Sequence, residues 1–163
     1  MLRTKLLRIT GYLMLSVEIR PATRGDHNSI RKLLERSGLP TDDLESAAPE
    51  FVVAVHGDKL IGVGALQRFA HTALLRSVAV SPEERGKGRG QQIVAELERV
   101  AHQRGVRELA LLTLTAADFF GRLGYRTVER SAMVGPICDS AEFRTLCPAS
   151  AVCMWKTLSA VEN

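Results

Sequence analysis

A strand, a glycine loop and a helix follow one another directly in the middle of the chain, and this succession most constrains its fold. Residues 73–80 are apolar except for Arg76 and Ser77, which predicts a strand, and residues 90–103 carry the apolar stripe of a helix. The loop between them ends in Arg85-Gly86-Lys87-Gly88-Arg89-Gly90. Because glycines before a helix N-terminus let several backbone N–H groups face one anion, the loop predicts a phosphate site. A flexible, solvated loop is the alternative.

The remaining hydrophobic pattern places this unit in one mixed α/β sheet. Thr23 and Asp26 form a capping-box pattern that starts a helix, and Gly38 with Pro40 ends it. The other expected strands are residues 17–20, 51–55, 60–68, 108–113, 125–129 and 151–158, and the other expected helices are residues 41–46 and 116–123, with a helical turn near 142–146. This order predicts a single sheet with helices packed on it.

Composition disfavours several classes of protein. The chain has 163 residues, of which 45% are hydrophobic and 25% are charged, so one globular domain is expected. No apolar run reaches the ~18–20 residues that a membrane span needs, so no membrane partner is predicted. The 22 Lys and Arg against 18 Asp and Glu give a net charge of +4, but aromatic residues make up only 5%. That balance favours a small anionic ligand over nucleic acid.

The first residues are interpreted as an extension. Arg8 and Gly11 interrupt the apolar stretch and no cleavage site follows, so we expect no signal peptide and predict a cytoplasmic location. The extension is placed at residues 1–14 and the domain at residues 15–163. Met14 stands directly before the first strand pattern, so a start of translation there is the alternative.

The three cysteines are expected to be reduced thiols. Cys138, Cys147 and Cys153 are an odd number in a chain without an export signal, which disfavours a disulfide framework. Trivalent arsenic and soft metals favour thiolate ligands. The C-x8-C-x5-C spacing matches no zinc pattern, however, and no metal is predicted.

The glycine loop fits neither of two common phosphate-binding patterns but does fit a third. A P-loop needs G-x-x-x-x-G-K-[ST], which is absent, and a dinucleotide fold needs its glycines immediately after the strand. Arg85-x-x-Gly88-x-Gly90 between an apolar strand and a helix resembles the acetyl-CoA signature of the GNAT N-acetyltransferases. Residues 116–125, AADFFGRLGY, resemble the family's second motif. The resemblance covers about residues 17–158.

The resemblance implies a fold, an activity and a cosubstrate. The fold is a mixed, mostly antiparallel sheet of six to seven strands with helices on both faces, in one domain. The activity is N-acetyl transfer from acetyl-CoA, with the diphosphate on the glycine loop, the pantetheine along the preceding strand, and no metal. The residues implied to bind acetyl-CoA are Val78, Ala79, Val80, Arg85, Gly86, Lys87, Gly88, Arg89, Gly90, Gln91, Thr113 and Phe120. The backbone N–H near Val78 is the expected donor to the developing oxyanion.

Three segments, LLRSVAVSPEERGKGRG, LLTLTAADFFGRLGYR and EFRTLCPASAVCM, are most similar to two groups within the family. These groups are the ArsN-type acetyltransferases of arsenic-resistance operons and the short N-acetylglutamate synthases. Both imply a small-molecule acceptor: the amino group of an acidic amino acid or of its arsenical or phosphinic analogue. No nucleic acid or membrane partner is implied, and a homodimer is left open.

Arg76 and Ser150 are the candidate substrate-binding residues. Strand alternation puts Leu74, Arg76 and Val78 on one face, and a charge in an apolar strand is costly unless it is paired or faces a cleft. A guanidinium suits a carboxylate or phosphinate, so Arg76 is interpreted as a substrate clamp. Its alternative is an ion pair with a structural carboxylate. Ser150 aligns roughly with a substrate-contacting serine of the glutamate-acetylating relatives.

The sequence departs from the family where proton transfer is expected. Leu74 stands where relatives often carry a glutamate base, and Phe120 where they often carry a tyrosine that protonates the thiolate. His71 or a water chain is the expected base, with an exposed loop residue as the alternative for His71. Thr113 and Thr115 flank the next strand end and can contact pantetheine or act as caps. A weak or non-catalytic member of the family is the other reading.

Two other functions compete with amino-acid acetylation. One is a CoA-binding or thiol-based sensor without turnover. The other is an acetyltransferase of protein N-termini or polyamines, for which Asp42, Asp43 and Glu45 would supply an acidic cleft. Such a cleft argues against Arg76 as a clamp.

Overall fold

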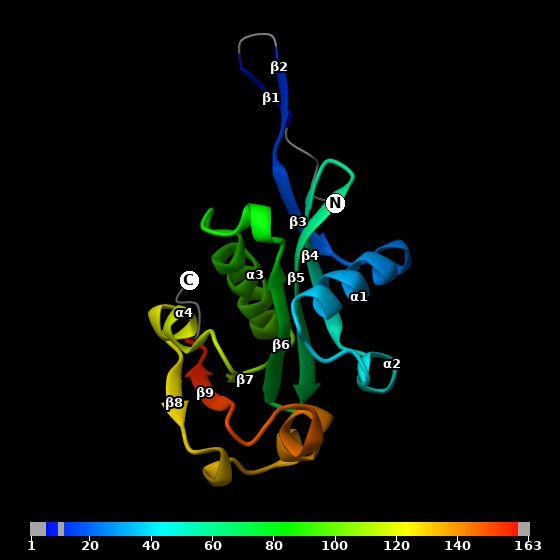
Figure 1. Cartoon of the computed structure of the whole chain (residues 1–163). Coiled ribbons are helices and arrows are strands. Elements are labelled where there is room, and N and C mark those ends of the chain that lie inside the picture. The colour runs from blue at the N-terminus through cyan, green and yellow to red at the C-terminus, as the bar shows by residue number, and fades with distance from the viewer. Residues whose placement is uncertain (1–5, 10–11, 160–163) are drawn as a thin grey trace.

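A computed structural model describes residues 6–9 and 12–159 of the chain. Strands β1 (Leu6–Ile9) and β2 (Tyr12–Leu15) pair with each other in a two-stranded antiparallel sheet. That hairpin is separate from the main sheet, which begins at β3 (Val17–Pro21), as Figure 1 shows. The described part of the predicted extension, residues 6–9 and 12–14, lies in these two strands. Residues 1–5, 10 and 11 of the extension lie outside the described residues. The boundary at residue 14 stays a prediction.

The main sheet has seven strands in the order β3-β4-β5-β6-β7-β9-β8. Beyond β3, its members are β4 (Glu50–His56), β5 (Lys59–Phe69), β6 (Thr72–Val80), β7 (Glu108–Thr113), β8 (Arg126–Val128) and β9 (Val152–Thr157). All neighbouring strands run antiparallel except β6 and β7, which run parallel. The predicted mixed, mostly antiparallel sheet is confirmed.

Helices cover both faces of this sheet. The helices are α1 (His27–Arg36), α2 (Leu44–Ala47), α3 (Arg89–Gln103) and α4 (Ala117–Arg122). Leu97 of α3 and Phe120 of α4 share one apolar core cluster, whereas Leu33 of α1 packs with Val53 and Val63 in another. Figure 1 shows α1 and α3 on opposite sides of the sheet. In the described part of the chain, no helix has the length and apolar character of a bilayer span.

Predicted and observed element ends differ by few residues. The Thr23–Asp26 capping box is present, with the Thr23 N–H donating to the Asp26 carboxylate at 2.7 Å. Helix α2 is shorter than its predicted range, a single turn that ends at Ala48 in the left-handed region with φ 41°. The predicted turn near residue 142 is a π-helical turn, Glu142–Leu146.

Candidate active site

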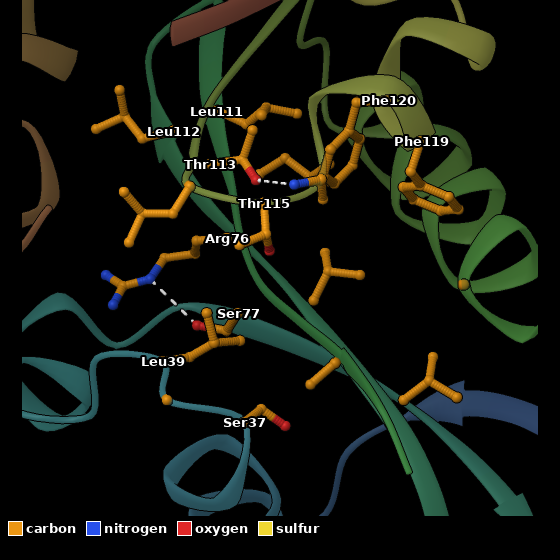
Figure 2. Close-up of a pocket in the computed structure, with 18 of the residues that line it drawn as sticks. Ser37, Leu39, Arg76, Ser77, Leu111, Leu112, Thr113, Thr115, Phe119 and Phe120 are labelled. Atoms are coloured by element: carbon orange, nitrogen blue, oxygen red, sulfur yellow. Dashed lines mark hydrogen bonds between the residues drawn. The ribbon is translucent and has the colours of Figure 1, made fainter. Parts of the chain in front are cut away.

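A cavity of about 1160 Å³ opens where two parallel strands diverge. Strands β6 and β7 pair from Thr72↔Glu108 only as far as Leu74↔Ala110. Beyond that point, residues 75–80 of β6 and residues 111–115 line the cavity from separate sides. Figure 2 shows Phe119 and Phe120 on one side of this cavity and Ser37 and Leu39 on the other. The splayed strands therefore expose part of the β6 backbone edge to the cavity.

The glycine loop forms one end of the cavity, and its backbone depends on its glycines. Gly86 and Gly88 both have φ +77°, a region that residues with a Cβ rarely adopt, and Gly88 is the N-cap of α3. A Cβ added at Gly90 would come within 3.1 Å of Phe119 Cζ. The glycines thus let α3 begin close to α4, with its first N–H groups beside the cavity.

Cationic side chains surround this end, together with one carboxylate. Arg85 Nε donates to the Val80 carbonyl at 3.1 Å. Glu84 Oε2 lies 3.5 Å from Lys87 Nζ and 3.6 Å from Arg89 Nε, and Glu84 itself lines the cavity. The predicted acetyl-CoA residues all line the cavity except Lys87, whose side chain is largely exposed. The sequence favours Glu84 as part of a solvated loop face, but its side chain is only 13% exposed.

Strand β6 carries a bulge in the middle of the cavity wall. Its register with β5 moves from Val63↔Ala79 to Ala65↔Arg76, so β6 has one extra residue there. Ser77 lies in this bulge with φ 57°, a rare value for a residue with a side chain. The expected alternation therefore breaks at Ser77.

The bulge corrects the prediction that Arg76 and Val78 share a face. Val78 packs against the core cluster that contains α3, whereas Leu74 belongs to a cluster with Ile137 and Phe143. Val78 lines the cavity directly after the bulge. Its role as an oxyanion donor stays a prediction.

Arg76 is held by protein carboxylates. Its terminal nitrogens donate to both oxygens of Asp43 at 2.6 and 2.7 Å, and one of them also donates to Gln67 Oε1 at 3.1 Å. Its Nε lies 3.2 Å from Glu142 Oε1 and 3.4 Å from Ser77 Oγ. The Arg76 side chain is 0% exposed. The ion-pair alternative therefore describes these contacts, and a clamp with a free guanidinium does not.

The same contacts remove Asp43 from the predicted acidic cleft, because Asp43 is buried and paired with Arg76. The other two acidic residues of that prediction, Asp42 and Glu45, are exposed.

The environment of this buried cluster shifts the pKa values of Arg76 and Glu142. Burial lowers the pKa of Arg76, but the hydrogen bond to Asp43 and the nearby carboxylate charges outweigh it and raise that pKa. Burial raises the pKa of Glu142 to about 7, against the attraction of Arg76 and with a further contribution from the charge of Asp43. The cluster thus has a carboxyl that titrates near neutral pH.

Two predicted residues lie away from the cavity. His71 is exposed in the turn between β5 and β6 and does not line the cavity. It precedes Val78 by seven residues, which is roughly 20 Å along a strand, so this position does not favour His71 as the base, and that role stays a prediction. Ser150 is also exposed and outside the lining, although its neighbours Pro148 and Ala151 line it.

The threonines at the end of β7 both line the cavity. Thr113 Oγ1 accepts the Ala116 N–H at 3.0 Å, so Thr113 supports the start of α4. Thr115, the expected cap, is exposed to the cavity instead.

Comparisons with known proteins identify the family. Residues 47–127 match the family model described as Acetyltransferase (GNAT) domain. An uncharacterised N-acetyltransferase of Chlorobaculum tepidum is 34% identical over 113 residues, which are 67% of this chain and 71% of that protein. The chain belongs to the GNAT acetyltransferase family. It is therefore an acyltransferase, as predicted.

Other GNAT relatives carry more specific names. An amino-acid acetyltransferase of Mycobacterium tuberculosis is 34% identical over 112 residues, 66% of this chain and 63% of that protein. One of Aeromonas salmonicida is 31% identical over 121 residues, 69% of this chain. The chain spans only 27% of that second relative's length.

Two solved structures share the fold. N-acetylglutamate synthase from Neisseria gonorrhoeae, complexed with coenzyme A and N-acetyl-glutamate, superposes with a TM-score of 0.76 at 24% identity, over 89% of this chain and 36% of that one. A Mycobacterium tuberculosis protein in complex with CoA and NLQ superposes with a TM-score of 0.74 at 28% identity, over 87% of this chain and 99% of that one.

The two positions at which the family resemblance implies proton-transfer groups hold apolar side chains here. Leu74 is fully buried in the core and does not line the cavity. Phe120 lines the cavity and packs edge-on against Tyr125, with ring centroids 5.5 Å apart. The Tyr125 hydroxyl donates to Glu98 at 2.9 Å, and Tyr125 is not a lining residue. Tyr125 therefore does not replace the absent hydroxyl.

Cys147 is a lining residue that sequence analysis assigned no role. Burial, with the charge of Glu142, raises the pKa of its thiol to about 11, so it is a neutral thiol at physiological pH. Only the folded structure brings it to the cavity, because Cys147 is the residue that directly follows the π-helical turn and belongs to no strand.

Proposed function

We propose that this chain transfers the acetyl group of acetyl-CoA to the α-amino group of a small amino acid, with an acidic amino acid or its arsenical or phosphinic analogue as the acceptor. The observation that carries the proposal is one continuous cavity. It joins the glycine loop, through the exposed edge of β6, to a second end between residues 37–40 and 146–148. A long, anionic thioester and a small amine both fit this arrangement.

The loop end fits the diphosphate of acetyl-CoA. The N–H groups at the start of α3 and the left-handed glycines can face one anion, and Arg85 and Arg89 add positive charge at the rim. The β6 edge beyond Leu74, which β7 leaves unpaired, can take the amide groups of the pantetheine arm. When bound, acetyl-CoA supplies the activated acetyl group.

The residues of the chain contribute chiefly by positioning. The Val78 N–H, beside the bulge, is the proposed donor to the thioester oxygen as negative charge develops there. Among the residues described as lining the cavity, Glu84 is the only carboxylate and none is a histidine. Because Glu84 is engaged with Lys87 and Arg89, solvent is the proposed acceptor of the amine proton. Solvent is also the proposed source of the proton for the CoA thiolate that leaves when the C–S bond breaks and the amide bond forms. Bringing both reactants together can supply most of the rate.

The acceptor class rests on the relatives. Proteins named amino-acid acetyltransferase match the chain, and structural neighbours hold CoA with N-acetyl-glutamate or NLQ. The acidic preference does not rest on Arg76, whose charge is already shared by two carboxylates.

A thiol-release assay with acetyl-CoA tests this function. The acceptor panel contains glutamate, aspartate, glutamine, a phosphinic glutamate analogue, spermidine and a short peptide with a free N-terminus. Thiol release with glutamate or its analogue supports the proposal. Release only with spermidine or the peptide contradicts the acceptor class. Calorimetric binding of CoA without thiol release from any acceptor contradicts catalysis and supports a CoA-binding sensor.

A further inference from the structure

The cavity end opposite the glycine loop is walled by two irregular segments. Residues 37–40 connect α1 to α2, and residues 146–148 end the π-helical turn and continue beyond it. Neither segment belongs to the sheet: backbone hydrogen bonds tie each one to its own helix or turn, and side chains connect it to the rest of the fold. Arg130 holds the second segment through its backbone, donating to the carbonyls of Cys147 at 3.3 Å and Pro148 at 2.8 Å.

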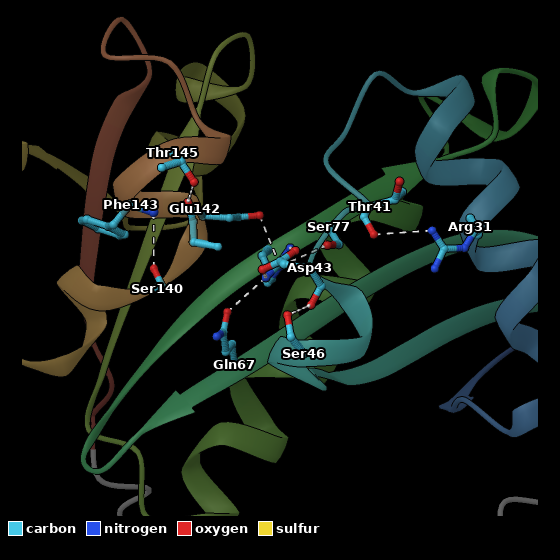
Figure 3. A network of polar contacts seen from close by, with 12 residues as sticks. Arg31, Thr41, Asp43, Ser46, Gln67, Ser77, Ser140, Glu142, Phe143 and Thr145 are labelled. Atoms are coloured by element: carbon cyan, nitrogen blue, oxygen red, sulfur yellow. Dashed lines mark hydrogen bonds and ion pairs between the residues drawn. The ribbon is translucent and has the colours of Figure 1, made fainter.

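Each wall segment has a carboxylate at its base, and both carboxylates bind the same guanidinium. Asp43 is the N-cap of α2, three residues after the first wall segment. Glu142 begins the π-helical turn that leads into the second. Figure 3 shows that Asp43 and Glu142 approach Arg76 from different elements, the start of α2 and the π-helical turn. Arg76 thereby links segments that are remote in the sequence.

We propose that Arg76 is a positioning residue that joins the two walls of the acceptor end, and that Glu142 makes this junction sensitive to pH. The assignment of this end to the acceptor rests on the proposed function. Arg76 acts through its partners, because its side chain is 0% exposed and its nitrogens are engaged by Asp43, Gln67 and Glu142. Its contact with Ser77 extends the same link to the β6 bulge.

The charge balance identifies Glu142 as the variable contact. Asp43 binds Arg76 through two short hydrogen bonds, whereas Glu142 has the single contact at 3.2 Å. The charged groups that act on Glu142 are Arg76 on β6 and Asp43 on α2, and Arg130 donates to its backbone carbonyl at 3.2 Å. Cys147 lies nearby as a neutral thiol. When both carboxylates ionise, the cluster carries one surplus negative charge.

The direction of the pH effect follows from linkage. The buried environment raises the pKa of Glu142 to about 7. A carboxyl that binds its proton more tightly when the junction is formed than when it is exposed to water stabilises the junction in its protonated form. The junction is therefore most stable below pH 4.5, weakens as the pH rises to about 7 and changes little above that, so it is weaker at pH 8 than at pH 6.

Kinetics at two pH values test the junction. The KM for the best acceptor is measured at pH 6 and pH 8 in the parent protein, Glu142→Gln, Arg76→Lys and the control Arg68→Lys, which alters a partly exposed pair with Glu50. For each protein we take the ratio of the KM at pH 8 to the KM at pH 6. This ratio is expected to be at least about three times larger in the parent than in Glu142→Gln, because only the parent has an ionisable group at position 142. Because the acceptor amine titrates identically in both assays, its effect on KM cancels when the parent and Glu142→Gln are compared.

Arg76→Lys separates positioning from folding. It keeps the charge but loses the planar fork, so the acceptor KM is expected to rise about tenfold while the Kd for CoA stays within twofold of the parent. Arg68→Lys is expected to change neither. Equal KM ratios in the parent and Glu142→Gln, together with an unchanged KM in Arg76→Lys, would overturn the inference.

Hydrogen exchange gives a readout that needs no acceptor. Amides of residues 37–43 and 142–148 are compared between the parent and Glu142→Gln at each pH. Exchange of both segments that is faster in the parent than in Glu142→Gln at pH 8, but not at pH 6, supports the junction. This holds even if no acceptor is turned over, and in that case only the proposed function fails. Exchange that matches Glu142→Gln at both pH values contradicts the junction even in an active enzyme.

Discussion

The two ends of the cavity are built in different ways. The loop end comes from one continuous stretch, residues 85–91, and presents mainly backbone N–H groups. The opposite end depends on side chains from separate elements that converge on the guanidinium of Arg76. A backbone site is sensitive to an added Cβ, whereas a convergent charge cluster is sensitive to the loss of one charge. The following substitutions separate these sensitivities.

The largest effect is expected from Arg76→Ala. Removal of the guanidinium leaves Asp43 and Glu142 buried without a cation, which typically costs about 3–5 kcal/mol. Urea denaturation at pH 8 measures the free energy of unfolding. The control Arg68→Ala removes a partly exposed ion pair, which is worth about 1 kcal/mol or less. A loss no larger than that of the control would show that the cluster contributes little to stability.

The second effect concerns Glu142→Gln and pH. Folding raises the pKa of Glu142 from 4.5 to about 7, so its ionisation destabilises the fold. This contribution is most favourable below pH 4.5, declines as the pH rises to 7 and is constant above it. The parent is therefore expected to lose on the order of 2–3 kcal/mol more than Glu142→Gln between pH 5 and pH 8. If the urea midpoints of the two proteins change with pH by the same amount between pH 5 and pH 8, the raised pKa of Glu142 is refuted.

A smaller effect is expected from Gly88→Ala at the loop end. Its φ of +77° costs alanine roughly 1–2 kcal/mol and disturbs the first turn of α3, so the Kd for CoA is expected to rise about three- to tenfold. Gly105→Ala is the matched control, since Gly105 has φ +79° in open space at the other end of α3. Calorimetry should show weaker CoA binding only for Gly88→Ala. Equal binding by both variants would argue against a role for the loop backbone.

The smallest effect is expected from His71→Ala. His71 lies in the exposed turn at the far end of β6, outside the cavity. The value of kcat/KM for the best acceptor is expected to stay within about twofold of the parent across pH 6–9, as for an exposed surface position. A loss of tenfold or more at neutral pH would restore its role as the base.

The two ends also differ in how far the sequence predicts them. The glycine loop is contiguous, and its strand and helix each have a clear period, so the sequence predicts the fold and a set of acetyl-CoA residues of which all but Lys87 line the cavity. Arg76 was recognised as anomalous, but its partners Asp43 and Glu142 stand 33 and 66 positions away in the chain. No local pattern links such residues, and only the folded chain identifies them.

The specific errors have physical causes. Strict alternation placed Val78 with Arg76 because a bulge at Ser77 leaves no mark in the hydrophobic pattern. His71 is near Val78 in the sequence, but each residue of an extended strand adds about 3.3 Å to the distance between them. Cys147 lines the cavity at the end of the π-helical turn, a segment whose sequence shows neither the helix period nor the strand period.

Binding of CoA to the glycine loop is the central claim, and an NMR titration of the isotopically labelled chain tests it most directly. The account expects the largest amide shifts at residues 85–91, with further shifts along residues 75–80 of β6, and reduced shifts at the loop in Gly88→Ala. Shifts confined to other surfaces, or none at saturating CoA, would contradict it.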